Sequence, residues 1–239
     1  MGVAGSGVAR SLGAESAPVN PAAVFCNAGS FDLYFFYTKP YNLDIQLEAA
    51  AAQFSKKRCA ISGFVQHFGN SLYQENQFIV TGALRVIENV VFGINARYAS
   101  LSIHRYGTAE SFIFDLGIIA RLHSQVNWGF AMKNANYAVI GQAKEPLPQI
   151  VAMGLSVRPI SNLLLNADIY KDARFPLDGR FGIEFSPFQI MSLRVGSGTA
   201  PSRLCAGFSV NLFNFRIDYA YSSHIDLGGS HLFAISFYK

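Results

Sequence analysis

The pattern on which the fold depends is clearest in Phe213-Asn214-Phe215-Arg216-Ile217-Asp218-Tyr219-Ala220-Tyr221. Its odd positions are all large and apolar, whereas Asn214, Arg216 and Asp218 stand between them. Alternation with a period of two residues predicts a β-strand with one apolar and one polar face. The same pattern recurs along the chain, for example in Leu163–Tyr170. A protein with many such strands either covers their apolar faces with a second layer or places them in lipid.

The composition favours lipid. The chain is 51% hydrophobic and 14% charged, whereas about a quarter of the residues in a typical soluble domain are charged. No window approaches the roughly 20 unbroken apolar residues of a membrane helix. Apolar residues interrupted by polar ones at every second position are typical of a transmembrane β-barrel, and 21 Phe and 11 Tyr are available for its aromatic girdles.

Alternation and chain breakers together locate the strands. We predict fourteen of them, over residues 31–37, 44–54, 58–68, 76–87, 90–103, 111–122, 126–133, 149–158, 163–170, 179–185, 190–196, 203–210, 213–221 and 231–238. Tight turns alternate strictly with longer connections, of which residues 134–148 form the longest. This asymmetry predicts an all-β, closed antiparallel transmembrane β-barrel of about fourteen strands in the bacterial outer membrane, with both termini in the periplasm.

The first thirty residues have a different character. Small residues dominate, Arg10 and Glu15 are the charged residues before Val24, and the segment continues through Asn20-Pro21-Ala22. A fourteen-stranded barrel is too wide for its own side chains to fill, since about eight strands already enclose a packed interior. We therefore predict that residues 1–30 form a hatch inside the lumen of a barrel formed by residues 31–239. No basic and apolar leader precedes this segment, so we expect a signal peptide to have been cleaved or to lie outside the sequence.

The predicted hatch has two kinds of anchoring residue. The Asn20 amide can satisfy neighbouring backbone groups, while Pro21 sets the direction of the chain before Ala22. Arg10 and Glu15 are expected to pair with charges of the barrel wall. The polar strand faces supply a lumenal charge network, which we predict to consist of Arg85, Arg97, Asp115, Arg121, Arg158, Asp168, Arg180, Glu184, Arg194, Arg216 and Asp218.

Arginines outnumber carboxylates in this predicted network, so the interior is expected to be net basic. Two interpretations follow. The simpler one is a set of salt bridges that fills and rigidifies the lumen, and the sharper one is a path that favours anions. Glu184 and Arg194 are the best local pair, because a turn at Ser186–Gln189 places them diagonally on adjacent strands.

The sequence gives no indication of nucleic-acid binding, metal binding or catalysis. The net charge of +4 is not clustered, so no nucleic-acid surface is expected. Cys26, Cys59 and Cys205 are too scattered for a metal site or a disulfide framework. Gly5-Ser6-Gly7 is no dinucleotide fingerprint, because Arg10 occupies the position of the third glycine. We expect no enzyme, no cofactor and no metal.

Short motifs carry a resemblance that spans nearly the whole chain. Met1–Ala9 and Asn20-Pro21-Ala22 resemble the N-terminal hatch of FadL-type outer-membrane barrels. The second half is similar to the PorV/PorQ branch associated with type IX secretion, in Met153–Arg158, Gly182–Phe185, Leu193–Gly196 and Ile217–Tyr221.

The two resemblances imply different functions. The PorV/PorQ branch implies a component of a larger envelope or secretion assembly, which docks protein partners through its rim and loops. The FadL type implies a conduit for hydrophobic or small solutes, gated by the hatch and able to hold a hydrophobic ligand. Because the predicted loops are short and the lumen is charged, the sequence favours the first function. In both cases the outer face contacts outer-membrane lipid.

Overall fold

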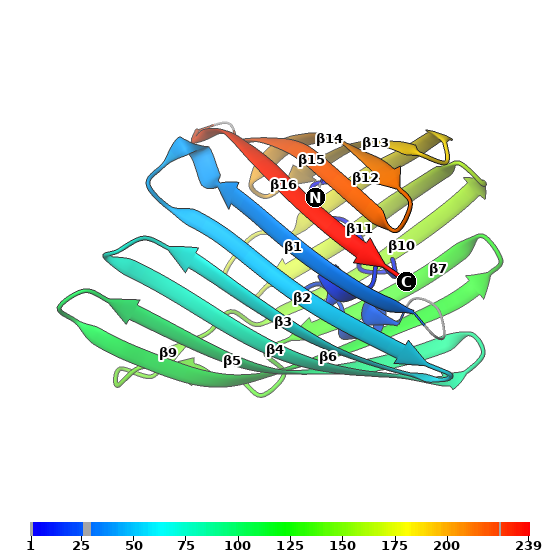
Figure 1. Cartoon of the computed structure of the whole chain (residues 1–239). Helices are drawn as coiled ribbons and strands as arrows, with labels where there is room; N and C mark the ends of the chain where they lie inside the picture. The colour runs from blue at the N-terminus through cyan, green and yellow to red at the C-terminus, as the bar shows by residue number, and fades with distance from the viewer. Residues whose placement is uncertain (1, 26–29, 225) are drawn as a thin grey trace.

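The computed structural model describes residues 2–25, 30–224 and 226–239. It forms a closed barrel in which each strand pairs antiparallel with its neighbours and β1 closes on β16 (Figure 1). The fourteen barrel strands are β1 (Phe31–Lys39), β2 (Gln46–Lys56), β3 (Cys59–Gly69), β4 (Tyr73–Ile87), β5 (Val90–Ile103), β6 (Gly107–His123), β7 (Val126–Lys133), β10 (Ile150–Ile160), β11 (Leu163–Asp172), β12 (Asp178–Phe188), β13 (Met191–Thr199), β14 (Ser202–Leu212), β15 (Phe215–His224) and β16 (Gly228–Tyr238). The predicted fold class is confirmed.

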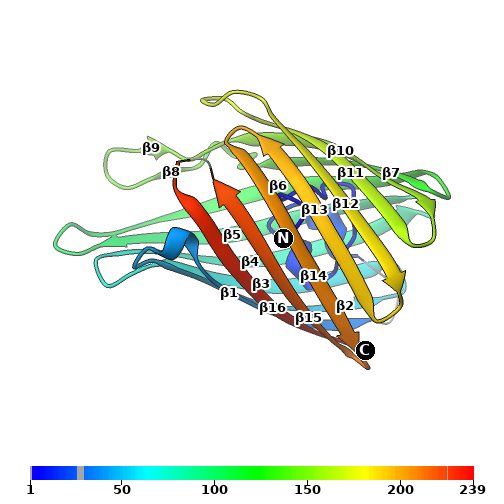
Figure 2. The same ribbon diagram turned by 90° about the horizontal axis from the view of Figure 1, so that it is seen from above.

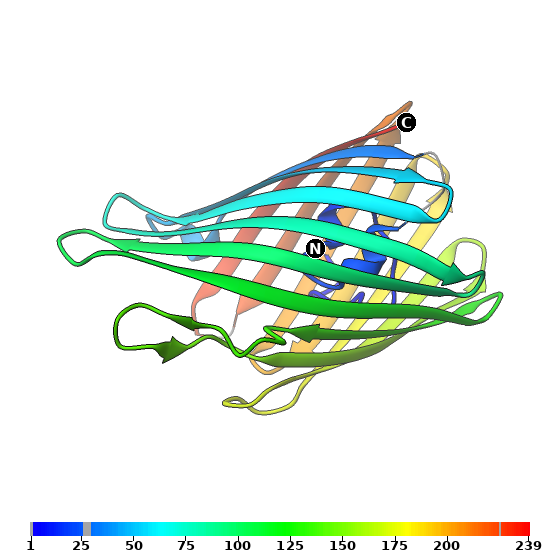
Figure 3. The same cartoon turned by 90° about the horizontal axis from the view of Figure 1, so that it is seen from below.

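The barrel is longest where β4, β5 and β6 meet. The hairpins that join β3 to β4 and β5 to β6 extend furthest from the C-terminal end (Figure 3). The predicted connection at residues 134–148 contains a small hairpin of β8 (Val139–Ile140) and β9 (Glu145–Pro146), which the sequence had not indicated. We call the end of the barrel with the longer connections the loop end, and the end with the tight turns the turn end. No helix in the described part of the chain is long and apolar enough to cross a membrane.

One strand boundary within Phe213–Tyr221 differs from its prediction. β15 begins at Phe215, because Phe213 and Asn214 form the turn after β14. Phe213 has a φ of 53°, a left-handed value that a regular strand does not contain. Its side chain is 97% exposed at the turn end. The alternation of the remaining residues is unaffected, and Phe215 and Ile217 face outward.

The apolar strand faces form the outside of the barrel, as predicted. The exposed side chains include Phe92, Phe112, Leu116, Leu155, Phe181, Phe215 and Ile217. Trp128 and Phe130 are half-buried on the same surface, where their rings stack with centroids 6.4 Å apart. This continuous apolar surface suits the hydrocarbon region of a bilayer.

The N-terminal segment, which we define as residues 2–25, lies within the ring of strands in all three views (Figures 1–3). It contains two short 3-10 helices, η1 (Ala14–Ser16) and η2 (Pro21–Val24). A third, η3 (Pro40–Asn42), follows β1. Val24 and Phe25 join a hydrophobic cluster with side chains of β1 to β4, including Phe64 and Ile79. Apolar packing thus holds one side of the segment against the wall.

Candidate functional site in the barrel lumen

Inward-facing glycines let the N-terminal segment approach the wall closely. A Cβ at Gly93 would collide with the backbone of Pro21 and Ala22, and one at Gly117 would collide with the Asn20 side chain. The same holds for Gly129, Gly182 and Gly196, whereas a Cβ at Gly154 would collide with the Asp168 carboxylate that binds the segment. We call the whole set the glycine wall: Gly93, Gly117, Gly129, Gly154, Gly182 and Gly196. Three pairs of them lie opposite each other in register, Gly93 with Gly117, Gly129 with Gly154 and Gly182 with Gly196.

The sequence reasoning missed this wall. Its signal was present, because glycines recur at the inward positions of neighbouring strands, where glycine otherwise weakens a strand. A glycine at such a position indicates that another backbone approaches closely.

Asn20 connects the segment to itself and to the wall. Its Nδ2 donates to the carbonyl oxygens of Val8 (2.7 Å) and Ile118 (3.2 Å). Its Oδ1 accepts from the amide of Ala22 at 3.0 Å and so caps η2, whose first residue is Pro21. Pro21 has no amide hydrogen that would need a partner at this position. Asn20 therefore fixes the start of η2 and holds this part of the segment against β6.

Asp168 on β11 holds the beginning of the segment. Its Oδ2 accepts hydrogen bonds from the amides of Gly7 (2.5 Å) and Val8 (3.0 Å). Nearby, the Tyr170 hydroxyl donates to the Gly5 carbonyl oxygen at 3.1 Å. A carboxylate that accepts from backbone amides makes charge-assisted hydrogen bonds, which are stronger than neutral ones.

A continuous chain of ion pairs begins and ends on the N-terminal segment. We call it the ion chain, and its members in order are Arg10, Glu184, Arg194, Asp218, Arg216 and Glu15. The five N–O distances along it are 2.8, 2.6, 2.5, 2.8 and 2.8 Å. Three arginines meet three carboxylates, so the chain is neutral. It fastens both ends of residues 10–15 to β12, β13 and β15.

One detail of the ion chain differs from its prediction. Glu184 and Arg194 lie directly opposite each other, not diagonally, because β12 continues to Phe188 and the turn moves to residues 189–190. Burial lowers the pKa of the Arg10 guanidinium below its usual range, and the neighbouring Glu184 carboxylate opposes this shift.

A second charged cluster lies beside the segment on β12 and β14. Asp178 accepts from Arg180 at 2.7 Å and from Arg203 at 3.1 Å. The Arg180 guanidinium also lies 3.5 Å from the centroid of the Tyr170 ring. Arg203 donates to the Ala4 carbonyl oxygen at 3.3 Å. Asp178 and Arg203 were absent from the predicted network, because both stand at strand ends where alternation is weakest.

Asp115 joins the wall to the loop end. Its Oδ2 accepts from Arg97 at 2.5 Å and from Asn95 at 3.0 Å, and its Oδ1 accepts from the Asn134 amide at 3.0 Å. Asn95 in turn donates to the Ala17 carbonyl oxygen at 2.8 Å. Asp115 therefore connects the long loop that begins at Asn134 with the N-terminal segment, and Asn95 is the residue between them.

Three arginines of the predicted network do not belong to it. Among the described residues Arg85, Arg121 and Arg158 form no ion pair. Arg85 lies over the Phe25 ring, 4.4 Å from its centroid. Arg121 and Arg158 are exposed at the turn end, where β-bulges interrupt the register. Arg10, Arg97, Arg180, Arg194, Arg203 and Arg216 are all paired with carboxylates, which favours the salt-bridge interpretation over a path for anions.

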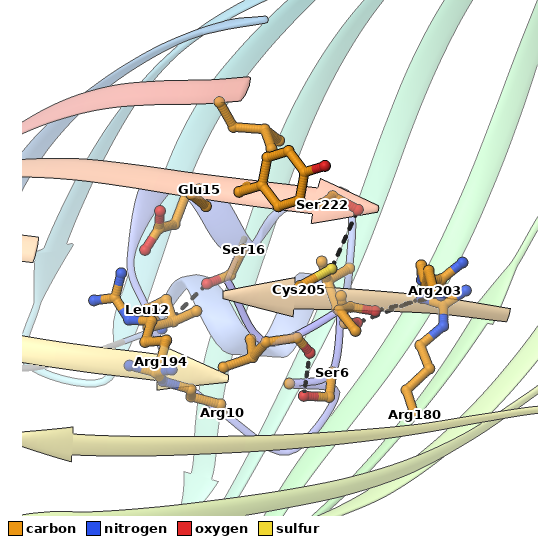
Figure 4. A pocket seen from close by; sticks show the side chains of 18 of the residues that line it. Ser6, Arg10, Leu12, Glu15, Ser16, Arg180, Arg194, Arg203, Cys205 and Ser222 are labelled. Atoms are coloured by element: carbon orange, nitrogen blue, oxygen red, sulfur yellow. Dashed lines mark hydrogen bonds between the residues drawn. The ribbon is translucent and has the colours of Figure 1, made fainter. Parts of the chain in front are cut away.

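Three cavities occupy the space that the segment leaves. The first, about 400 Å³, lies between the segment and β12 to β16, and its lining mixes Leu12, Val19 and Ala220 with Arg10 and Arg194 (Figure 4). The second, about 430 Å³, opens at the turn end. The third, about 480 Å³, lies at the loop end under residues 140–150. In the described parts of the chain no cluster of His, Cys, Asp or Glu could hold a metal ion, and Cys26 lies outside them.

The glycine wall makes a testable prediction about the segment. Gly93→Val should displace Pro21 and Ala22 at a cost of roughly 1–3 kcal/mol, the usual range for overpacking. We expect a protease to cleave the N-terminal segment of the detergent-solubilised barrel faster in this variant. Gly63→Val is the matched control, because a Cβ at Gly63 meets open space on the outer face of β3. Equal cleavage rates in the two variants would show that the glycine wall does not position the segment.

Comparison with known proteins identifies the fold of the chain, but it identifies no family and no related sequence. No family model matches the chain, and no curated protein matches its sequence. Among solved structures, the toluene transporter TbuX of Ralstonia pickettii is similar with a TM-score of 0.69 and 13% identity, over 100% of this chain and 96% of that one. The toluene transporter TodX of Pseudomonas putida reaches a TM-score of 0.75 at 10% identity, over 100% and 96%.

A Pseudomonas aeruginosa FadL homologue is also similar, with a TM-score of 0.62 and 11% identity, over 99% of this chain and 98% of that one. The chain therefore has the fold of FadL-like outer-membrane barrels. The resemblance to the PorV/PorQ branch gains no support from these comparisons.

Proposed function

We propose that the chain is an outer-membrane conduit for small, mainly apolar solutes. Residues 2–25 act as its hatch, and both termini lie on the periplasmic side. The observation that carries this proposal is the cavity between the segment and β12 to β16, because it lies inside the barrel and its lining includes apolar side chains such as Leu12 and Val19. The structural likeness to toluene transporters supports the same class of solute. A role in a secretion assembly has no comparable observation in its favour.

The size and chemistry of the cavities support small solutes. Volumes of about 400 to 480 Å³ lie in the range of small-molecule sites. At the loop end, Leu101, Ile113 and Ile150 supply an apolar lining. The arginines of the cavity beside the segment are held in ion pairs, so an apolar solute does not have to desolvate a free charge there.

The orientation follows from the connections. Tight turns of an outer-membrane barrel face the periplasm and longer loops face outward. The C-terminus and the start of β1 lie at the turn end, where the amide of Phe31 donates to the Lys239 carbonyl oxygen at 2.9 Å. A solute taken up from outside would meet the loop-end cavity first and the N-terminal segment next.

The test is uptake of radiolabelled toluene by bacterial cells whose outer membrane contains lipopolysaccharide. We expect cells with the chain to take up toluene faster than cells without it. Ala220→Trp should abolish this difference, because Ala220 is buried and lines the cavity beside the segment. Ile217→Trp on the outer face of the same strand is the control and should retain uptake.

The uptake rates can be compared only if both variants are folded, and heat-modifiable gel mobility verifies that they are. Uptake by folded Ala220→Trp barrels at the rate of the unchanged chain would exclude this cavity as the path. Equal uptake by cells with and without the unchanged chain would contradict the proposed function.

A further inference from the structure

Six polar side chains lie next to one another across the inner faces of β1 to β6. Each stands opposite the next in the strand register. We call this set the polar row, and its members in strand order are Asp32, Gln53, Ser62, Thr81, Asn95 and Asp115.

The polar row connects two cavities. Asp32 lines the cavity at the turn end, and Asp115 lines the one at the loop end. Strands of a membrane barrel tilt by about 35–45°, so a line drawn perpendicular to them climbs along the barrel axis. The row therefore leads from one mouth of the lumen towards the other, along the wall and beneath the N-terminal segment.

Half of the row is a continuous set of hydrogen bonds. Thr81 donates from Oγ1 to Asn95 Oδ1 at 2.7 Å, and Asn95 donates from Nδ2 to Asp115 Oδ2 at 3.0 Å. The Ala17 carbonyl oxygen accepts a second bond from Asn95 Nδ2 at 2.8 Å. This carbonyl places the segment directly over the row.

The other half lacks partners within the protein. Gln53 is 1% exposed and Ser62 is 3% exposed. The Gln53 amide nitrogen and oxygen and the Ser62 hydroxyl have no hydrogen-bond partner among the described residues. Buried polar groups are nearly always bonded, either to protein or to ordered water. Three unpartnered polar atoms on two adjacent residues therefore indicate bound water.

Alanines flank this part of the row, with Ala51, Ala60 and Ala83 on the wall and Ala14 and Ala17 on the segment, in a cluster that also contains Phe25 and Phe64. We propose that the polar row binds a file of ordered water molecules between the wall and the segment, which forms a hydrated path between the two cavities. This path shares the loop-end cavity with the solute but is separate from the cavity between the segment and β12 to β16.

The charges at the two ends suit a neutral occupant such as water. Asp32 shares the turn-end cavity with Glu15, Arg216 and Lys239. At the loop end, Asp115 is paired with Arg97, and Lys133 lines the same cavity. Both entrances therefore carry both signs of charge, which gives neither cations nor anions an advantage.

Osmotic water permeability tests the proposal. Proteoliposomes of the full chain are mixed with a hyperosmotic solution of an impermeant sugar, and their shrinkage is followed by stopped-flow light scattering. We expect faster shrinkage than in protein-free vesicles. The double variant Gln53→Met and Ser62→Ala should lose this increase, because it removes the unpartnered polar atoms with little change in volume.

Ser192→Ala is the matched control. Ser192 is buried on β13, across the lumen from the row, and bonds to Ser186 at 2.8 Å. This control should shrink at the rate of the unchanged chain. Heat-modifiable gel mobility verifies that each variant is folded, and toluene uptake by the double variant should be unchanged, since the solute cavity is not touched.

Two shrinkage results would overturn the proposal. One is shrinkage of folded double-variant vesicles at the rate of the unchanged chain, and the other is a full-chain rate no higher than that of protein-free vesicles. A crystal structure in which Gln53 and Ser62 bond to protein atoms alone would also contradict it. None of these results bears on uptake of the apolar solute, so the two proposals fail independently.

Discussion

Deletion of residues 2–19 is expected to leave a folded barrel with a much higher single-channel conductance in planar bilayers than the full chain. The deleted residues occupy the lumen and pack against the glycine wall. Their removal also takes away Arg10 and Glu15, the two ends of the ion chain. The strands keep their ladders, because every barrel strand is paired on both sides without the segment. Water replaces the segment and solvates the remaining charges.

A graded series strengthens this experiment. Arg10→Gln combined with Glu15→Gln removes only the two ionic contacts of the segment, so its conductance should lie between those of the full chain and the deletion. Exposed Glu110→Gln on the outer part of β6 is the control and should behave like the full chain. Conductance of the folded deletion equal to that of the full chain would mean that residues 2–19 do not obstruct the lumen.

The second large effect concerns the outer face. Ile183→Arg should destabilise the barrel by about 2–4 kcal/mol, the cost of an arginine on the lipid face near the bilayer midplane. Ile183 is exposed on β12, with Phe181 and Phe185 on the same face. The measurement is the fraction of folded barrel in lipid vesicles across a urea titration, read by heat-modifiable gel mobility.

Ile190→Arg is the control for the depth of the substituted residue in the bilayer. Ile190 is also exposed, but it stands in the turn between β12 and β13, where an arginine costs about 0–1 kcal/mol because it reaches the interface. A comparable loss for both variants would place Ile183 outside the hydrocarbon region and would argue against a lipid-facing β12.

Alternation alone predicted most of the strands and both of their faces. Phe92, Phe181 and Ile217 lie on the apolar outer face and Asp115 and Arg194 lie inside, as their positions in the pattern indicated. The physical reason is that a strand has a period of two residues, so local order along the chain assigns each side chain to a face. The closed architecture followed from the lengths of the connections.

The ends of the strands needed the tertiary structure. Phe213 continues the apolar alternation but belongs to the turn, and Arg121 and Arg158 continue the polar alternation but stand at bulges, exposed. At these positions the register with the neighbouring strand decides the conformation. The pattern within one strand contains no information about that register.

The lumen shows the same division. Local patterns show that residues 2–25 are mostly small and sparsely charged, that inward positions carry ions, and that the outer face is apolar. The closed barrel was needed to show that Arg10 and Glu15 end one ion chain and that six glycines form one wall. The physical reason is that closure of the barrel brings together side chains far apart in the sequence, such as Glu15 and Arg216, and their pairing depends on strand order and register.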